Sequence, residues 1–237
     1  MARSKSLYLL GGDNQLLEQV AAEMLQGVGA REPRVALLLA GSERMSKHLP
    51  NYIDPFMRCG AAAVDLVSPD GAGAFDYAAA EKTIQDAAVI YIGGGNTTQY
   101  LQLYATEPLR SVICEQYEQG VPIAGLSAGV LTLCDRCAVR KNLEDFTFEV
   151  QSGLGLIKDL TIGVHFDGPG RLEFLLDAMT AMQNSRGIGI DSFACVLLQD
   201  SQVQWVWEKY SQAAYAVAMT DPTTKAYTMT KLTEASN

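Results

Sequence analysis

Histidine, tryptophan and basic residues are scarce in this sequence, and it contains no long apolar run. There are two His and two Trp, and 18 Lys and Arg stand against 27 Asp and Glu, which gives a formal net charge of −9. A nucleic-acid-binding protein needs a basic surface that displaces counterions, and no run of Lys or Arg is present, so we expect no nucleic acid partner. No apolar stretch reaches the roughly 18 residues of a membrane span, so we expect no membrane partner either.

Cysteine is also sparse, with five residues at spacings that do not suggest a disulfide scaffold. The pair Cys134 and Cys137 forms a C-x-x-C, but two further ligands at a compatible spacing are not evident, so we interpret it as chance spacing. We expect neither a metal nor a cofactor. The apolar run 7–10 is too short for a secretory signal and reads as a first strand, which favours a cytoplasmic protein.

Short apolar runs alternate with amphipathic segments along most of the chain. This rhythm predicts an α/β fold, a three-layer sandwich in which helices cover both faces of a mostly parallel central sheet. The chain has no linker-like segment, so we predict one domain over residues 1–237. The predicted strands are 6–10, 34–39, 63–67, 87–92, 121–126 and 161–165, and the predicted helices are 14–27, 76–86, 97–104, 107–119 and 170–182.

The last part of the sequence has a different pattern, in which strand-like segments follow one another with only short breaks. We predict antiparallel strands at the edge of the sheet for residues 193–198, 203–207, 212–218 and 225–229. Trp205 and Trp207 alternate along one of them and therefore face the same side. They fit either core packing or a surface for a homodimer, which the sequence leaves open.

A serine lies at the junction of a predicted strand and a predicted helix. Residues 121–126 form a buried strand, Ala128 begins a helix, and Ser127 occupies the turn Gly-Leu-Ser-Ala-Gly between them. A G-x-S-x-G turn in this context is typical of a nucleophile elbow, which lifts the serine hydroxyl out of the sheet. The N–H of Ala128, at the helix N-terminus, is a candidate oxyanion donor. The alternative is a small-residue turn without chemistry.

Three glycines follow the predicted strand 87–92. They allow close approach of the backbone to a ligand, and Asn96 or Thr97 can cap the next helix. We predict that the N–H of Gly94 or Gly95 completes an oxyanion hole with Ala128. Phosphate binding is the alternative function, but neither standard phosphate-loop pattern is present. A flexible loop without function is the other alternative.

A nucleophilic serine needs a base, usually a histidine, and the chain offers two. His48 lies in a polar segment before a proline and looks like a surface residue. His165 ends the predicted strand 161–165, on the face that carries Thr161 and Gly163, where small side chains leave room for a substrate. We therefore predict His165 as the base.

In combination, residues 93–97, the serine turn 125–129 and the segment 153–156 leading to His165 resemble the dipeptidase E and cyanophycinase family of serine peptidases. The resemblance runs from about residue 6 to about 198. It implies a flavodoxin-like fold similar to class I glutamine amidotransferases, and a small aspartyl or β-aspartyl peptide as substrate. It also implies Ser127 as nucleophile, His165 as base and the glycine loop as oxyanion hole.

The acid that should orient the histidine is the weakest part of this match. Members of the family often carry a glutamate after a strand like 187–191, but this chain has Ser192 there. We take Asp191 as the candidate acid, with Glu144, Asp145 and Asp167 as alternatives. We assign Asn96, Thr97 and Arg171 to substrate binding, although Arg171 fits a solvated first turn of a helix equally well.

The function predicted from the sequence is a serine peptidase that hydrolyses a small peptide through an acyl-enzyme on Ser127. The missing glutamate motivates an alternative, a homologue that has lost catalysis and binds a metabolite or a partner. An esterase or amidase with the same machinery ranks third, because lipase-like esterases usually have longer chains and place the acid between serine and histidine.

Overall fold

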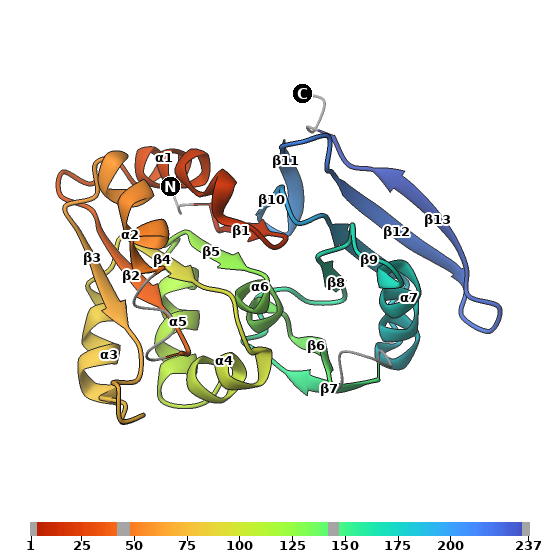
Figure 1. The fold of residues 1–237 in the computed structure, drawn as a ribbon, viewed down its shortest axis with the longest axis horizontal. Coiled ribbons are helices and arrows are strands. Elements are labelled where there is room, and N and C mark those ends of the chain that lie inside the picture. The colour runs from red at the N-terminus through yellow and green to blue at the C-terminus, as the bar shows by residue number, and fades with distance from the viewer. Residues whose placement is uncertain (1–3, 42–47, 142–146, 234–237) are drawn as a thin grey trace.

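The computed structural model describes residues 4–41, 48–141 and 147–233. Within these ranges, a central sheet of seven strands has the order β11-β10-β1-β5-β4-β2-β3 (Figure 1). Its strands are β1 (Ser6–Leu10), β2 (Arg34–Leu38), β3 (Ala63–Val67), β4 (Val89–Ile92), β5 (Ile123–Leu126), β10 (Ala194–Gln199) and β11 (Gln202–Glu208). The first five are parallel to one another, while β10 and β11 pair antiparallel at the edge.

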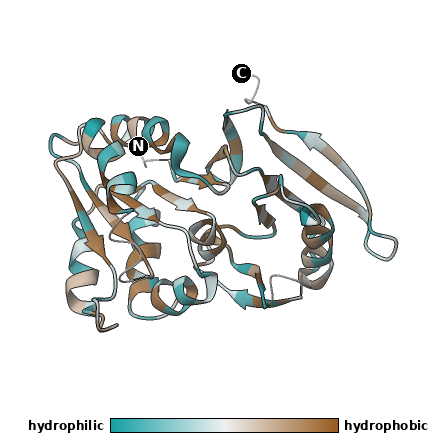
Figure 2. Ribbon diagram, in the orientation of Figure 1, coloured by the Kyte–Doolittle hydropathy of each residue, from teal (hydrophilic) through white to brown (hydrophobic). Residues whose placement is uncertain are grey.

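Helices cover both faces of the central sheet because its strands are apolar on both sides. On β1, Leu7 and Leu9 pack into one core cluster, whereas Tyr8 and Leu10 pack into another. The brown strands between mixed-coloured helices in Figure 2 show the same pattern. The predicted three-layer sandwich is therefore confirmed. No helix of the described residues combines the length and apolar character needed to cross a bilayer.

The two helical layers differ in size. One face is covered by the short 3-10 helix η1 (Asn14–Leu16), α1 (Leu17–Val28) and α2 (Leu49–Arg58). The other face is covered by α3 (Tyr77–Gln85), α4 (Thr97–Tyr104), α5 (Leu109–Glu118) and α6 (Ala128–Leu133). The predicted segment 97–104 has the same bounds as α4. Helix α2 was not predicted, because Pro55 lies in its interior, where proline disfavours a helix.

A second sheet stands beside the first, with the order β13-β12-β9-β8 (Figure 1). It consists of β8 (Thr161–Val164), β9 (Arg186–Ile190), β12 (Ala214–Asp221) and β13 (Ala226–Lys231), and α7 (Arg171–Met182) packs against it. The central core cluster continues into this sheet through Ile162, Val164 and Ile188.

The second sheet corrects two predictions. Strand 161–165 does not join the central parallel sheet but pairs with β9. The tail segments 212–218 and 225–229 extend this second sheet, whereas 193–198 and 203–207 lie at the central edge as predicted. Apolar patterning gives the existence of a strand but not its partner, which explains both errors.

A two-stranded hairpin, β6 (Arg136–Arg140) and β7 (Phe148–Ser152), follows α6 and precedes β8 in the sequence. It was not predicted, because β6 is short with charged ends and β7 is largely polar and solvent-exposed. The hairpin places Arg140 near the carboxyl edge of the central sheet, where it matters for the site described below.

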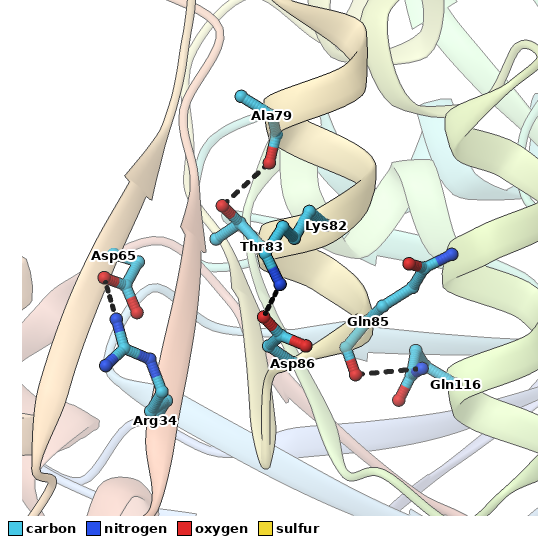
Figure 3. A network of polar contacts seen from close by, with 8 residues as sticks. All are labelled: Arg34, Asp65, Ala79, Lys82, Thr83, Gln85, Asp86 and Gln116. Atoms are coloured by element: carbon cyan, nitrogen blue, oxygen red, sulfur yellow. Dashed lines mark hydrogen bonds and ion pairs between the residues drawn. The ribbon is translucent and has the colours of Figure 1, made fainter.

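Polar contacts tie the outer elements together without dominating stability. Arg34 on β2 pairs with Asp65 on β3 at 2.6 Å, and Gln116 on α5 donates to the Gln85 carbonyl at the end of α3 at 3.4 Å (Figure 3). The ion pair is partly exposed and is worth at most about 1 kcal/mol. The apolar clusters on the two faces of the sheet therefore hold the fold.

Tyr104 offers a test of this core. Its ring is fully buried, and its hydroxyl lies 2.8 Å from the carbonyl oxygens of both Leu39 and Val67. Tyr104→Phe leaves these carbonyls without that donor, so we expect the free energy of unfolding to fall by about 1–2 kcal/mol in urea titrations. Tyr77→Phe, at an exposed tyrosine, is the control and should change it by less than about 0.5 kcal/mol. Equal values for the two variants would contradict this assignment.

Candidate active site

Ser127 lies in a strained turn between β5 and α6. Its φ of 49° and ψ of −105° fall in a region that non-glycine residues rarely occupy. Its N–H donates to the Leu10 carbonyl at 3.0 Å, which fixes the turn to the neighbouring strand β1. A Cβ at Gly129 would lie 2.2 Å from the Ile92 carbonyl oxygen, so α6 can begin this close to β4 only with glycine. The strand-to-helix turn predicted for Ser127 is confirmed.

His165 reaches the serine from the other sheet. It follows β8 with a φ of 50°, and its N–H donates to the Gly11 carbonyl at 3.1 Å. The imidazole Nε2 lies 2.9 Å from the Ser127 Oγ, which is hydrogen-bonding distance. His48 is exposed beside α2 and lines a separate cavity. Of the two histidines, the structure brings the predicted one to the serine.

Gly12 forms the surface on which the imidazole rests. A Cβ at this position would lie 2.2 Å from the His165 Nδ1. The residue after it, Asp13, donates its N–H to the Ser192 carbonyl at 2.9 Å. The loop after β1 therefore holds the backbone around the ring while leaving no room for another side chain.

The Nδ1 side of the imidazole faces Ser192, whose Oγ lies 3.2 Å away. Ser192 in turn donates to the carboxylate of Asp167, from both its hydroxyl and its backbone N–H at 2.8 Å. Gln212 donates to the other oxygen of Asp167 at 3.0 Å. Asp167 was one of our alternative acids. In the sequence, Ser192 stands out only as the residue in place of a glutamate, and nothing marks Gln212.

The candidate acid Asp191 is not brought to the histidine. Its carboxylate accepts from the Ala213 N–H at 2.9 Å, and the side chain is buried. Burial, partly offset by this N–H, raises its pKa. Asp191 begins a turn that the Ala194 N–H closes on the Asp191 carbonyl at 3.0 Å, and the next residue, Ser192, faces the imidazole. The geometry corrects our choice of Asp191, while Glu144 and Asp145 lie outside the described residues.

The glycine loop after β4 lies beside the serine turn, because Ile92 pairs with Gly125 across β4 and β5. The Tyr100 hydroxyl donates to the Gly94 carbonyl at 3.0 Å. Gly95 has a φ of 149°, and Asn96 caps α4 by accepting from the Gln99 N–H at 3.2 Å. The predicted cap at Asn96 is therefore present.

A cavity of about 430 Å³ opens at this junction. The predicted site residues that line it are Gly95, Asn96, Thr97, Ser127, His165 and Arg171. Gly94 and Ala128 are not part of its lining, although both adjoin residues that are. Arg140 and Lys141, which the sequence does not single out, also line it, and Lys141 forms an ion pair with Glu149 at 3.5 Å.

Charge and burial keep the imidazole of His165 neutral at neutral pH. Burial is the largest effect that lowers its pKa and the Arg171 charge adds to it, while Asp167 acts in the opposite direction. The pKa of Arg171 is itself lowered by burial and by the nearby Arg140. A neutral imidazole with one nitrogen on a serine hydroxyl can accept a proton from it.

Nothing at this site suggests a metal. Among the described residues, no group of three or more His, Cys, Asp or Glu side chains could hold a metal ion. Cys134 and Cys137 are both buried thiols, and burial raises the pKa of each. Neither thiol lies in the cavity lining.

Comparison with known proteins decides the family. The model of peptidase family S51 matches residues 7–206. The chain belongs to peptidase family S51. This confirms the resemblance to dipeptidase E and the cyanophycinases.

Curated relatives in this family are distant. A cyanophycinase of Nostoc sp. (strain PCC 7120) is 22% identical over 209 residues, which cover 84% of this chain and 67% of the relative. An uncharacterized peptidase of Bacillus subtilis (strain 168) is 26% identical over 136 residues, which cover 54% of this chain and 55% of the relative. The chain thus spans about two thirds of the length of the cyanophycinases that it matches.

A solved structure agrees with the fold over the whole chain. The crystal structure of a peptidase from an acI-B1 Actinobacterium superposes with a TM-score of 0.76 at 19% identity. The superposition covers 99% of this chain and 96% of that chain. At this identity the likeness shows the fold, and the chemistry has to be argued from the residues present.

The contact between Gly12 and the imidazole can be tested directly. Gly12→Ala places a methyl group where the ring now lies, so we expect the Oγ–Nε2 separation of Ser127 and His165 to open beyond about 3.5 Å in a crystal structure. Gly27→Ala is the matched control, because a Cβ there meets nothing within 4 Å. An unchanged separation in Gly12→Ala would show that Gly12 does not set the ring position.

Proposed function

We propose that this protein is a serine peptidase that hydrolyses a small aspartyl or β-aspartyl peptide through an acyl-enzyme on Ser127. The observation that carries the proposal is the 2.9 Å contact between the Ser127 Oγ, on a strained elbow, and the His165 Nε2. Membership of a peptidase family supports the same reaction class.

The proposed reaction has two stages. Ser127 Oγ attacks the peptide carbonyl carbon while its proton moves to His165 Nε2, and that proton then passes to the departing amine as the C–N bond breaks. Water next attacks the resulting ester, giving its proton to Nε2, and the proton returns to Ser127 as the acid product leaves. The lowered pKa of His165 suits it to the role of base near neutral pH.

Two backbone N–H groups are suited to bind the oxyanion that forms on attack. Ala128 is the first residue of α6, and an N–H in the first turn of a helix has no partner within that helix. The Gly94 carbonyl is bound by Tyr100, and the N–H of the same trans peptide, on Gly95, points the opposite way from that ring. Within the described residues no hydrogen bond occupies the N–H of Gly94, Gly95 or Ala128.

A guanidinium in the cavity supports an anionic substrate. The chain carries a net charge of −9, yet the partly buried Arg171 lines the same cavity as Ser127. A partly buried guanidinium recognises a carboxylate well, because charge-assisted bonds strengthen away from water. We assign Arg171, with Asn96 and Thr97 nearby, to the substrate's acidic group.

Loss of catalysis is the competing proposal, motivated by Ser192 in place of the family's glutamate. Turnover of Asp-X dipeptides separates the two proposals. Ser127→Ala should lower kcat by at least about 10³-fold, since a nucleophile cannot be replaced by a methyl group. Ser111→Ala, at an exposed serine of α5, is the control and should match the wild type. Equal turnover by Ser127→Ala and wild type would refute the assignment.

The role of Arg171 predicts a change in specificity. Arg171→Gln should reduce kcat/KM for Asp-X by about 10- to 100-fold and affect Asn-X much less, because only the former loses a charge-assisted bond of about 1.5–3 kcal/mol. Arg58→Gln is the control, since Arg58 pairs with Glu18 away from the cavity. A loss of the same size for Asp-X and Asn-X would exclude Arg171 as the reader of the acidic group.

A further inference from the structure

The number of hydrogens that each group carries determines which group donates in the hydrogen bonds behind His165. Asp167 is held as a carboxylate: although burial opposes its ionisation, the hydrogen bonds from Ser192 and Gln212 together lower its pKa. An ionised carboxylate only accepts hydrogen bonds. The Ser192 hydroxyl, 2.8 Å away, must therefore donate its single hydrogen to Asp167.

The hydrogen position on Ser192 determines which nitrogen of the imidazole is protonated. Since the Ser192 hydrogen points at Asp167, its Oγ can only accept from the His165 Nδ1, 3.2 Å away. Nδ1 must then carry the hydrogen of the neutral ring, which leaves Nε2 with a lone pair towards Ser127. This is the tautomer that a general base in this position requires.

Gln212 binds the Asp167 carboxylate, the last group in this series of hydrogen bonds. Its Oε1 accepts from the Phe193 N–H at 2.8 Å, so its amide nitrogen is the end that faces Asp167, at 3.0 Å. The backbone N–H of Ser192 adds a further donor to Asp167. All three donors to Asp167 thus come from the segment after β9 and from Gln212, just before β12.

We infer that Ser192 and Asp167 act together as positioning residues, a hydroxyl bridge and a remote carboxylate that take the place of a single acid against His165. The inference rests on the proposed function, because it assigns the base of that same site. On this inference, two side chains of this chain take the place of the single glutamate that is absent. Neither residue touches the substrate; both act through the imidazole.

The kinetic test uses paired variants at the bridge. Ser192→Ala removes the acceptor for Nδ1–H, so kcat for Asp-X should fall by about 10- to 1000-fold with little change in KM. Ser192→Thr keeps a hydroxyl and should recover a large part of that loss. Asp167→Asn should lower kcat similarly. Thermal unfolding of each variant reports whether it is folded. A kcat within twofold of wild type in both Ser192→Ala and Asp167→Asn would overturn the inference.

The pH profile provides a readout that a purely structural role would not move. The charged groups that act on His165 are Arg171, which lowers its pKa, and Asp167, which raises it. Removing the Asp167 charge should therefore lower the pKa of His165 further, so the acid limb of kcat/KM moves to lower pH in Asp167→Asn. A shift in the opposite direction, or none, would contradict the coupling.

An NMR titration separates failure of this inference from failure of the proposed function. The chain has two histidines, so His48→Gln leaves one imidazole, and His48 lies outside the site. In this background we expect the neutral ring of His165 to carry its proton on Nδ1, and Ser192→Ala to reduce that preference. An unchanged tautomer would overturn the inference. The expected tautomer in a protein with no turnover of Asp-X would support the bridge and refute the proposed peptidase.

Discussion

The contact between Ser127 and His165 depends on two sheets that meet beside Gly11 and Gly12. Ser127 follows strand β5 of the central sheet and His165 follows strand β8 of the second sheet. The Ser127 N–H donates to the carbonyl of Leu10, the last residue of β1, and the His165 N–H donates to that of Gly11, the next residue. Gly12 leaves the imidazole just enough room. Strain at both residues, each with a positive φ, is maintained because the core cluster is continuous across the two sheets.

Charged groups of opposite sign lie on the two sides of this contact. On the substrate side, burial and the charge of Arg171, which we propose to bind an acidic ligand, lower the pKa of the imidazole. On the opposite side, the charge of Asp167 raises that pKa, and its hydrogen bond with Ser192 fixes the hydrogen on Nδ1. We propose that burial and these two opposing charges give a base with a lowered pKa and a defined tautomer, without direct contact with a carboxylate.

The sequence predicted what depends on local pattern. The buried strands, the strand-to-helix turn at Ser127, the position of His165 after a strand and the cap at Asn96 each follow from residues close together in the chain. What it missed depends on distant pairing: the second sheet, the hairpin that brings Arg140 to the cavity, and Gln212 beneath Asp167. Asp191 was chosen because it is adjacent to the expected position, but its carboxylate turns to the Ala213 N–H.

Covalent labelling tests the central claim, that His165 activates Ser127, most directly. Wild type and His165→Gln would be incubated with a fluorophosphonate at pH 7 and the adduct mapped by peptide mass spectrometry. We predict a single adduct on the peptide that contains Ser127, forming at least about 100-fold more slowly in His165→Gln. No adduct on Ser127 in the wild type, or equal rates in the two proteins, would contradict the account.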